Sequence, residues 1–318
     1  MQVLISGAAG FIGSHFVDRL LRDGHSVLGV DNFITGDRAN LGHLSGVKEF
    51  RFVEADATAN DFVSRMTALG PFDLVLHLAS LASPKEYLNY PLETLESGST
   101  ATRNMLELAV RFEARFLVTS TSECYGDPLE HPQTESYWGN VNPIGPRSCY
   151  DESKRYAEAL TMAYHRKFGL RTNIARIFNT YGPRMKLDDG RVVPAFLSQA
   201  LEGQPLTMFG DGTQTRSFCY VDDLVEGLCR LMLSEEREPV NLGNPQEITL
   251  LVFAERIQKM LGTACPIEFH PLPKDDPTRR QPDISKAKRV LDWAPTYNLE
   301  EGLAPTVAYF QGKLAARR

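Results

Sequence analysis

A glycine-rich turn near the start of the chain constrains the fold more than any other feature. The stretch GAAGFIG at residues 7–13 follows a short apolar run, 3–6, and opens a segment with apolar residues at helical spacing. Glycines placed in this way allow a tight turn and let backbone N–H groups at a helix N-terminus approach a pyrophosphate. In this strand–turn–helix setting the pattern predicts a dinucleotide site, and a glycine-rich turn without a ligand is the alternative. The candidates for cofactor binding in this turn are Gly7, Gly10, Phe11, Ile12 and Gly13.

Short apolar runs alternate with amphipathic helical segments over the first 180 residues. The runs span residues 3–6, 26–30, 50–54, 74–78, 116–120 and 172–177. Such alternation favours parallel strands joined by helices that cover both faces of a sheet. We therefore predict an α/β protein with a Rossmann-type, doubly wound parallel sheet.

The pattern changes near residue 180, where proline and glycine begin to separate shorter elements. We predict a dinucleotide-binding Rossmann domain over residues 1–180. Residues 181–318 are expected to form mainly a smaller α/β lobe for substrate binding. Segments near 215–245 are expected to return to the main sheet.

Composition excludes several classes of function. A net charge of −6 gives no reason to expect nucleic acid or an anionic membrane as a partner. No apolar run reaches the length of about 18 residues that a membrane span requires. The first strand begins at once and the five cysteines form no CxxC pair, so a cytoplasmic protein with reduced thiols is expected. No metal is expected, although carboxylates from distant positions remain open as ligands.

Acidic residues after the second and third predicted strands bear on which dinucleotide binds. Asp31 lies 18 residues beyond Gly13, where a carboxylate can accept hydrogen bonds from ribose hydroxyls. Its charge would repel a 2′-phosphate and therefore favours NAD over NADP, whereas the nearby cation of Arg38 acts against this preference. Asp56 either reaches the adenine or is an ordinary loop acid. Further candidates for NAD binding are Asn32, Leu78, Ala79, Ser80 and Ile177.

The stretch CYDESK at residues 149–154 predicts a site that handles protons. Residues four apart share one face of a helix, so Tyr150 and Lys154 point the same way. A neighbouring cation lowers the pKa of a tyrosine, which is near 10 in the free residue. Thr121, at the end of a preceding strand, can supply a hydroxyl to the substrate oxygen that the Tyr150 phenol would contact. The YxxxK spacing alone is common by chance, but it becomes specific together with the glycine turn and this hydroxyl.

This combination resembles the extended short-chain dehydrogenase/reductase family over nearly the whole chain. Longer segments narrow the resemblance to UDP-glucuronate decarboxylases. These segments are STSECYGDP at 120–128, YWGNVNPIGPR at 137–147, RIFNTYGPRM at 176–185, DGRVV at 189–193 and QTRSF at 214–218.

The resemblance implies an NAD-dependent decarboxylation of UDP-glucuronate to UDP-xylose. The sugar would be oxidised at C4, lose CO2 as the 4-keto sugar and be reduced again. Tyr150 would take the C4 hydroxyl proton, Lys154 would hold the phenolate and the nicotinamide ribose, and Thr121 would support the same oxygen. A UDP-sugar 4-epimerase, a 4,6-dehydratase and a non-catalytic NAD-binding protein are the alternatives.

Three further residues are implied in catalysis. In the 4,6-dehydratases an Asp-Glu pair follows the threonine, whereas this chain has Ser122-Glu123. The resemblance places Glu123 at the carboxylate region of the substrate, and the alternative is a carboxylate that binds loop backbone. It places Arg216 at the substrate carboxylate, with a water to relay the C5 proton; the alternative is an ion pair with Asp222 or Asp223.

Substrate binding and assembly also follow from the resemblance. Arginine suits a diphosphate because its fork donates two hydrogen bonds, although a surface ion pair is the alternative for each arginine. Relatives pair two helices of each subunit into a four-helix bundle, so a homodimer is expected. The expected substrate contacts are Ser83, Asn179, Arg191, Thr207, Arg216, Asp276 and Arg279, the last as part of the pair Arg279-Arg280 near Asp276.

A few positions depart from the decarboxylase pattern. Glu93 and Glu96 lie where the decarboxylases have lysines, and Gly98 replaces an asparagine. If the two glutamates face the substrate, affinity for UDP-glucuronate should fall or another sugar should be used. If they lie on a solvated helix face, binding should not change. Ser80-Leu81 replaces a Cys-Pro pair, and Cys124 replaces a valine.

Overall fold

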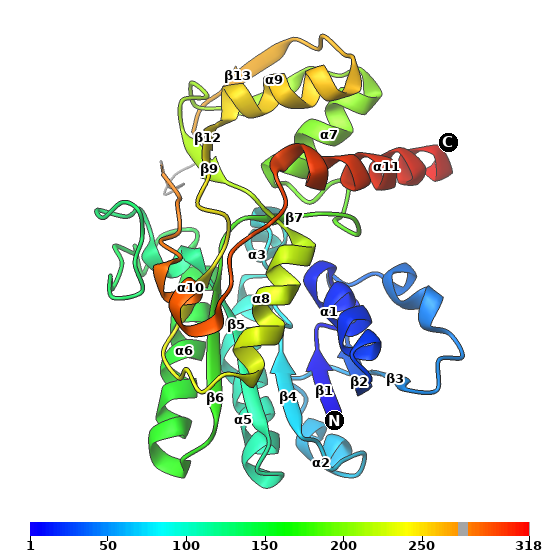
Figure 1. Cartoon of the computed structure of the whole chain (residues 1–318), viewed down its shortest axis with the longest axis vertical. Helices are drawn as coiled ribbons and strands as arrows, with labels where there is room; N and C mark the ends of the chain where they lie inside the picture. Colours follow the sequence, from blue (N-terminus) through cyan, green and yellow to red (C-terminus); the bar gives the residue numbers. More distant parts are fainter. Residues whose placement is uncertain (273–278, 318) are drawn as a thin grey trace.

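The structure, a computed structural model, describes residues 1–272 and 279–317 and contains a seven-stranded parallel sheet (Figure 1). The strand order is β11-β6-β5-β4-β1-β2-β3. This arrangement confirms the predicted α/β, Rossmann-type fold. The strands are β1 (Gln2–Ser6), β2 (Ser26–Asp31), β3 (Phe50–Glu54), β4 (Leu74–His77), β5 (Arg115–Thr121), β6 (Thr172–Ile177) and β11 (Val240–Leu242).

Helices cover both faces of this sheet. On one face α1 (Phe11–Arg22) packs against α8 (Val221–Leu233), and their apolar side chains share one core cluster. On the other face α2 (Phe62–Thr67), α5 (Thr102–Arg111) and α6 (Ser148–Phe168) share a second cluster. Because both faces are buried, β1 and β4 are nearly continuous apolar runs without polar alternation.

A second group of elements lies beyond the carboxyl ends of the strands, at the top of Figure 1. Its short strands pair in twos, β13 with β8 in parallel and β12 with β9 in antiparallel fashion. After α8 the chain returns to the large sheet, where β11 pairs with β6 at one edge. The elements of this group are α7 (Val192–Glu202), β8 (Leu206–Phe209), β9 (Thr215–Ser217), β12 (Glu247–Thr249), α9 (Leu250–Leu261), β13 (Ile267–His270) and α11 (Leu299–Arg317).

Short elements complete the described chain, and local sequence signals set several helix ends. The Thr249 side chain accepts a hydrogen bond from the Val252 N–H at the start of α9, and Gly262 ends that helix with a left-handed φ of 64°. Gly169 ends α6 in the same way. The remaining elements are η1 (Arg38–Leu44), α3 (Pro84–Asn89), α4 (Pro91–Glu96), η2 (Ser97–Ala101), η3 (Ser122–Tyr125), β7 (Thr180–Tyr181), β10 (Cys219–Tyr220) and α10 (Ser285–Leu291).

Within the described residues, no helix combines the length and the apolar character needed to cross a membrane.

Candidate active site

A cavity of about 1260 Å³ lies between the carboxyl ends of the strands and the second group of elements. Sites for one drug-sized ligand usually have about 300–1,000 Å³, so this cavity exceeds that range. Most of the residues predicted from the sequence line it. These are Gly7, Gly10, Phe11, Ile12, Gly13, Leu78, Ser80, Ser83, Thr121, Ser122, Glu123, Tyr150, Lys154, Ile177, Asn179, Arg191, Thr207 and Arg216.

The glycine turn is packed so closely that two of its glycines leave no space for a side chain. A Cβ on Gly13 would lie 1.9 Å from the Gly7 carbonyl oxygen, and Gly7 has a φ of +75°. A Cβ on Gly7 would lie 2.7 Å from the backbone nitrogen of Ala79, so Ala79 packs behind the turn. The first N–H groups of α1 have no partner within the helix and border the cavity. This arrangement fits a dinucleotide pyrophosphate.

Asp31 is buried at the end of β2, close to this turn. Its carboxylate accepts hydrogen bonds from the backbone N–H groups of Ala9 and Phe33, both at 2.9 Å. Burial raises the pKa of Asp31 in spite of these bonds. A Cβ on the cavity-lining Gly36 would lie 2.8 Å from Asp31 Oδ1, so the carboxylate approaches the cavity wall. Since each carboxylate oxygen can accept more than one hydrogen bond, Asp31 remains able to accept from a ribose.

Neighbouring charged groups are already paired with protein partners. Arg38 forms a 2.5 Å ion pair with Glu54 and lies 4.0 Å from the centroid of the Phe33 ring. Asp56 accepts hydrogen bonds from the Thr58 N–H and hydroxyl, which is how a loop acid is commonly used. Asn32 donates to the same carboxylate at 3.1 Å.

Tyr150 is buried at the N-terminal end of α6. Its ring stacks on that of Tyr87, with centroids 5.2 Å apart. Burial raises the pKa of the Tyr150 phenol above its usual range, and the hydrogen bond with Thr121 only partly opposes this effect. The structure therefore brings Thr121 and Tyr150 together as predicted, but the expectation of a lowered phenol pKa is wrong for this site.

Lys154 lies close to Tyr150 but is held by a neighbouring strand. Its ammonium nitrogen donates a 2.7 Å hydrogen bond to the Thr119 carbonyl and lies 6.0 Å from the Tyr150 ring centroid. Burial lowers the pKa of Lys154 to about 8. The cation is thus close to the phenol but hydrogen-bonded to β5.

Glu123 is held by arginines, and not by loop backbone. It forms ion pairs with Arg147 at 2.5 Å and with Arg280 at 3.0 Å. Burial opposes its charge, but Arg280, Arg147 and Arg216 together hold the pKa of the Glu123 carboxyl below its usual range. Arg280 also donates to the Ser122 carbonyl at 2.9 Å, so one guanidinium fixes both residues of the Ser122-Glu123 pair.

Arg216 lies on β9 and lines the cavity on the side of Glu123. Its guanidinium donates to the Thr215 carbonyl at 2.9 Å. The carboxylate of Asp223, one of the two partners considered for Arg216, accepts hydrogen bonds from the backbone of Thr296 and Tyr297.

Only some of the other residues predicted to bind substrate line the cavity. Arg191 lines the cavity and forms an ion pair with Asp189, and the Thr207 hydroxyl accepts from Gln199 at 2.8 Å. Arg279 is exposed and does not line the cavity, whereas Asp276 lies outside the described residues. In residues 1–272 and 279–317 no group of three or more His, Cys, Asp or Glu side chains is placed to hold a metal ion.

Comparison with known proteins places this geometry in a family. The model of the NAD dependent epimerase/dehydratase family matches residues 3–243. The chain belongs to this family. Among curated members it is 51% identical over 314 residues to UDP-glucuronic acid decarboxylase 1 of Arabidopsis thaliana, covering 99% of this chain and 71% of that protein. It is 50% identical over 313 residues to UDP-glucuronic acid decarboxylase 1 of Danio rerio, covering 98% and 73%. The predicted resemblance is confirmed.

Solved structures of family members share the whole fold. UDP-glucose 4-epimerase of Thermotoga maritima, solved with UDP-glucose, has a TM-score of 0.91 at 30% identity and covers 99% of this chain and 100% of that chain. UDP-glucuronic acid 4-epimerase of Bacillus cereus, solved with UDP-glucuronic acid and NAD, has a TM-score of 0.85 at 29% identity and covers 98% and 100%.

The acidic departures from the decarboxylase pattern lie away from the cavity wall, whereas Ser80 lines the cavity. Glu93 and Glu96 are exposed on α4, and neither lines the cavity. Gly98 is buried against α6, where a Cβ would lie 2.5 Å from the Ser153 carbonyl oxygen. The structure thus corresponds to the alternative in which the two glutamates are solvated.

Sequence reasoning did not assign Arg147 or Tyr87 to the site, and it considered Arg280 only as part of the Arg279-Arg280 pair for substrate binding. Arg147 ends the segment YWGNVNPIGPR at residues 137–147, and Arg280 is the neighbour of the predicted Arg279. Which arginine of that pair points inward depends on packing: Arg280 is 1% exposed, and its nearest acid, Glu123, is 157 residues away in the chain. No pattern in the sequence marked Tyr87 as a site residue.

Proposed function

We propose that this protein decarboxylates UDP-glucuronate to UDP-xylose and retains NAD through the reaction. The observation that carries the proposal is one cavity that joins the glycine turn, the Thr121–Tyr150 pair and the Glu123–Arg216 side. Identities of 50–52% to UDP-glucuronic acid decarboxylases, over 95–99% of the chain, support this substrate. A solved relative that holds UDP-glucuronic acid and NAD together supports the use of the cavity for both ligands.

Bound NAD would supply a hydride acceptor for C4 of the sugar and return the hydride at the end. Tyr150 takes the proton of the C4 hydroxyl and later gives it back, and Thr121 holds the same oxygen. Tyr150 must be a phenolate to accept this proton, and because burial raises the pKa of the phenol, the ammonium of Lys154 is needed to stabilise that phenolate. Lys154 also binds the nicotinamide ribose.

The carboxylate is lost from the 4-keto sugar because it is then β to a carbonyl. Negative charge develops on the C4 oxygen, where the Tyr150 and Thr121 hydroxyls donate hydrogen bonds. Arg216 faces the substrate carboxylate and orders the water that protonates C5, since a guanidinium rarely gives up its own proton. Glu123 remains ionised and keeps this region polar and oriented through Arg147 and Arg280.

The remaining assignments follow from the same scheme. Asp31, with Asn32 and Asp56 beside it, binds the adenosine end of NAD, and residues 181–318 contribute mainly to the nucleotide-sugar side. Arg191, Asn179, Ser83 and Thr207 bind the nucleotide diphosphate and base, and Asp276 and Arg279 are assigned to the same ligand. We further propose a cytoplasmic homodimer; sedimentation at low micromolar concentration that shows only a monomer would contradict the dimer.

The decisive experiment is mass spectrometry of the products formed from UDP-glucuronate with and without added NAD. Release of CO2 with UDP-xylose or its 4-keto precursor is expected. UDP-galacturonate without CO2 would identify a 4-epimerase instead. The variant Tyr150→Phe should bind NAD but form no product, whereas a non-catalytic NAD-binding protein would show no turnover even with Tyr150 intact.

A further inference from the structure

The carboxylate of Glu158 on α6 is hydrogen-bonded to residues of three other elements, β5, η3 and β6, close to Tyr150 and Lys154. Glu158 lies one helical turn after Lys154 and two turns after Tyr150, so all three face β5. Its carboxylate accepts from the Ser120 hydroxyl of β5 at 2.5 Å and from the Cys124 thiol of η3 at 3.4 Å. Arg176 of β6 donates to both carboxylate oxygens, at 2.9 and 2.7 Å. We call these four residues, Ser120, Cys124, Glu158 and Arg176, the Glu158 cluster.

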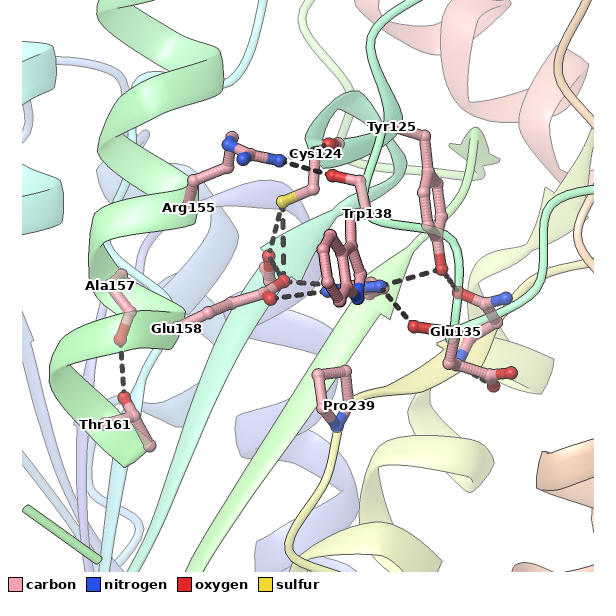
Figure 2. Close-up of polar contacts among 12 residues, drawn as sticks. Cys124, Tyr125, Glu135, Trp138, Arg155, Ala157, Glu158, Thr161 and Pro239 are labelled. Atoms are coloured by element: carbon pink, nitrogen blue, oxygen red, sulfur yellow. Dashed lines mark hydrogen bonds and ion pairs between the residues drawn. The ribbon is translucent and has the colours of Figure 1, made fainter. Parts of the chain in front are cut away.

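The cluster holds the chain on both sides of the catalytic segment. Ser120 immediately precedes Thr121, and Cys124 immediately follows Glu123. Figure 2 shows the Glu158 side chain pointing from α6 toward Cys124, while Arg155 from the same helix donates to the Trp138 carbonyl. The Cys124 carbonyl also accepts from Arg155, at 3.1 Å.

The far side of the cluster is anchored as well. Arg176 donates to the Tyr125 hydroxyl at 3.0 Å, and that hydroxyl donates to Asn241 of β11 at 2.7 Å. The Glu158 and Arg176 side chains are each 12% exposed, which makes their bidentate pair far less screened than a surface pair. Glu158 itself does not line the cavity, so any effect on the reaction must pass through its neighbours.

The carboxyl group of Glu158 also acts on Lys154. The other groups that face the ammonium are the Tyr150 ring, the Thr119 carbonyl, His77 and Cys124. Burial lowers the pKa of His77 to about 4 and raises that of Cys124 to about 12, so both are uncharged at neutral pH. Burial lowers the pKa of Lys154 to about 8, and the negative charge of Glu158 acts against this decrease.

From this geometry we propose that Glu158 is a positioning residue for the proposed decarboxylation: it fixes Thr121 and Glu123 relative to Tyr150 and keeps Lys154 charged. The inference rests on the proposed function, because it assumes that the charged Lys154 is the active form. The inference predicts the direction in which the activity profile of a Glu158 variant shifts with pH. Removing the negative charge lets Lys154 lose its proton at lower pH, so the alkaline limb of the activity profile moves to lower pH.

The test compares Glu158→Gln, Glu158→Asp and Thr161→Val in the full-length enzyme. Thr161 lies on the next turn of α6 and donates a buried 2.7 Å hydrogen bond to the Ala157 carbonyl (Figure 2), so Thr161→Val removes a buried hydrogen bond without touching the cluster. Values of kcat and KM for UDP-glucuronate are measured from pH 6 to 9.5, and the folded fraction is followed by circular dichroism. The NAD dissociation constant is measured over the same range, because Lys154 is assigned to the nicotinamide ribose.

For Glu158→Gln we expect kcat to fall by about 10²-fold, as for a misplacement of about 1 Å, with KM nearly unchanged. The alkaline limb of its activity profile should lie at lower pH than in the wild type. As the pH is raised, its NAD binding should also begin to weaken at a lower pH than that of the wild type. Glu158→Asp keeps the charge and should keep the wild-type limb, with a reduced kcat. Thr161→Val should keep both the limb and a kcat within about twofold of the wild type.

A folded Glu158→Gln enzyme with the wild-type limb and kcat would overturn the inference. An equal shift of the limb in Glu158→Asp or Thr161→Val would also overturn it, because the charge of Glu158 would then not be the cause. If Glu158→Gln does not fold, a wild-type kcat in Glu158→Asp would serve as the contrary result. A wild-type enzyme without decarboxylase activity would contradict the proposed function but not the inference. The pH dependence of NAD binding would still show whether Glu158 acts on Lys154.

Discussion

The ring of Tyr87 lies parallel to the ring of Tyr150, within 8° and with centroids 5.2 Å apart. Tyr87 is buried and lines the cavity, so it covers one face of the proposed catalytic phenol. Replacing Tyr87 with Leu should lower kcat about fivefold, because an aromatic pair contributes about 1 kcal/mol beyond its buried area. Tyr87→Phe keeps the ring and should remain within about twofold of the wild type. Equal losses in both variants would show that the hydroxyl, and not the stacking, matters.

The parts of the fold that depend on local pattern could be predicted from the sequence. The glycine turn and the alternation of apolar runs with helices are local signals, and they gave the parallel sheet correctly. The pairing of β11 with β6 joins segments more than 60 residues apart, so the return of residues 240–243 to the main sheet could be expected from the sequence but not their partner strand.

Most of the predicted site residues line one cavity, but the electrostatics of the cavity could not be predicted from the sequence. The YxxxK spacing places Tyr150 and Lys154 on one face, yet it contains no information about burial. Burial decides the direction of both pKa shifts, upward for Tyr150 and downward for Lys154. The pairing of Glu123 with Arg280 likewise joins distant parts of the chain, which no local pattern reports.

The Glu123 ion pairs make a prediction about stability. Glu123→Gln would leave Arg147 and Arg280 without their shared carboxylate and should lower the free energy of unfolding by about 3–5 kcal/mol at pH 7. Because the pKa of Glu123 is lowered in the folded protein, its contribution is complete above its ordinary value of 4.5 and is lost as the pH falls through the folded value. The difference between variant and wild type should therefore shrink below about pH 4.

Urea unfolding at pH 7 and at a series of lower pH values measures this dependence. The control is Glu130→Gln, a change at an exposed glutamate a few residues further along the chain. It should alter the free energy of unfolding by less than about 0.5 kcal/mol. A destabilisation by Glu123→Gln that is constant with pH would contradict the proposed charge pairing.

Close packing in the glycine turn predicts a loss of cofactor binding in Gly13→Ala. The added Cβ would lie 1.9 Å from the Gly7 carbonyl oxygen, so α1 must move away from the turn that borders the cavity. NAD affinity measured by calorimetry should fall at least about 10²-fold, the effect of displacing a binding group by about 1 Å. Gly42→Ala is the matched control, because a Cβ on Gly42 meets nothing within 4 Å, and its NAD affinity should be unchanged.

The ion pair between Arg38 and Glu54 predicts how selectivity for NAD could be relaxed. Glu54→Gln would free the Arg38 guanidinium to meet a 2′-phosphate, and NADP affinity should rise relative to NAD. Both partners are exposed, so the gain should be only about two- to fivefold and should disappear in high salt. Glu49→Gln, an exposed change just before β3, should leave the ratio of the two dissociation constants unaltered. An equal rise in both variants would mean that general charge, and not Arg38, sets the selectivity.

Charge reversal on α4 tests whether the departures from the decarboxylase pattern affect the substrate. Glu93 and Glu96 are exposed and do not line the cavity. Exposed charges farther from a ligand than the screening length, about 8 Å at physiological salt, act on it only weakly. The double variant Glu93→Lys/Glu96→Lys should therefore leave the KM for UDP-glucuronate within about twofold of the wild type. A KM that falls tenfold or more would mean that α4 contacts the substrate during turnover, and that these two glutamates weaken its binding.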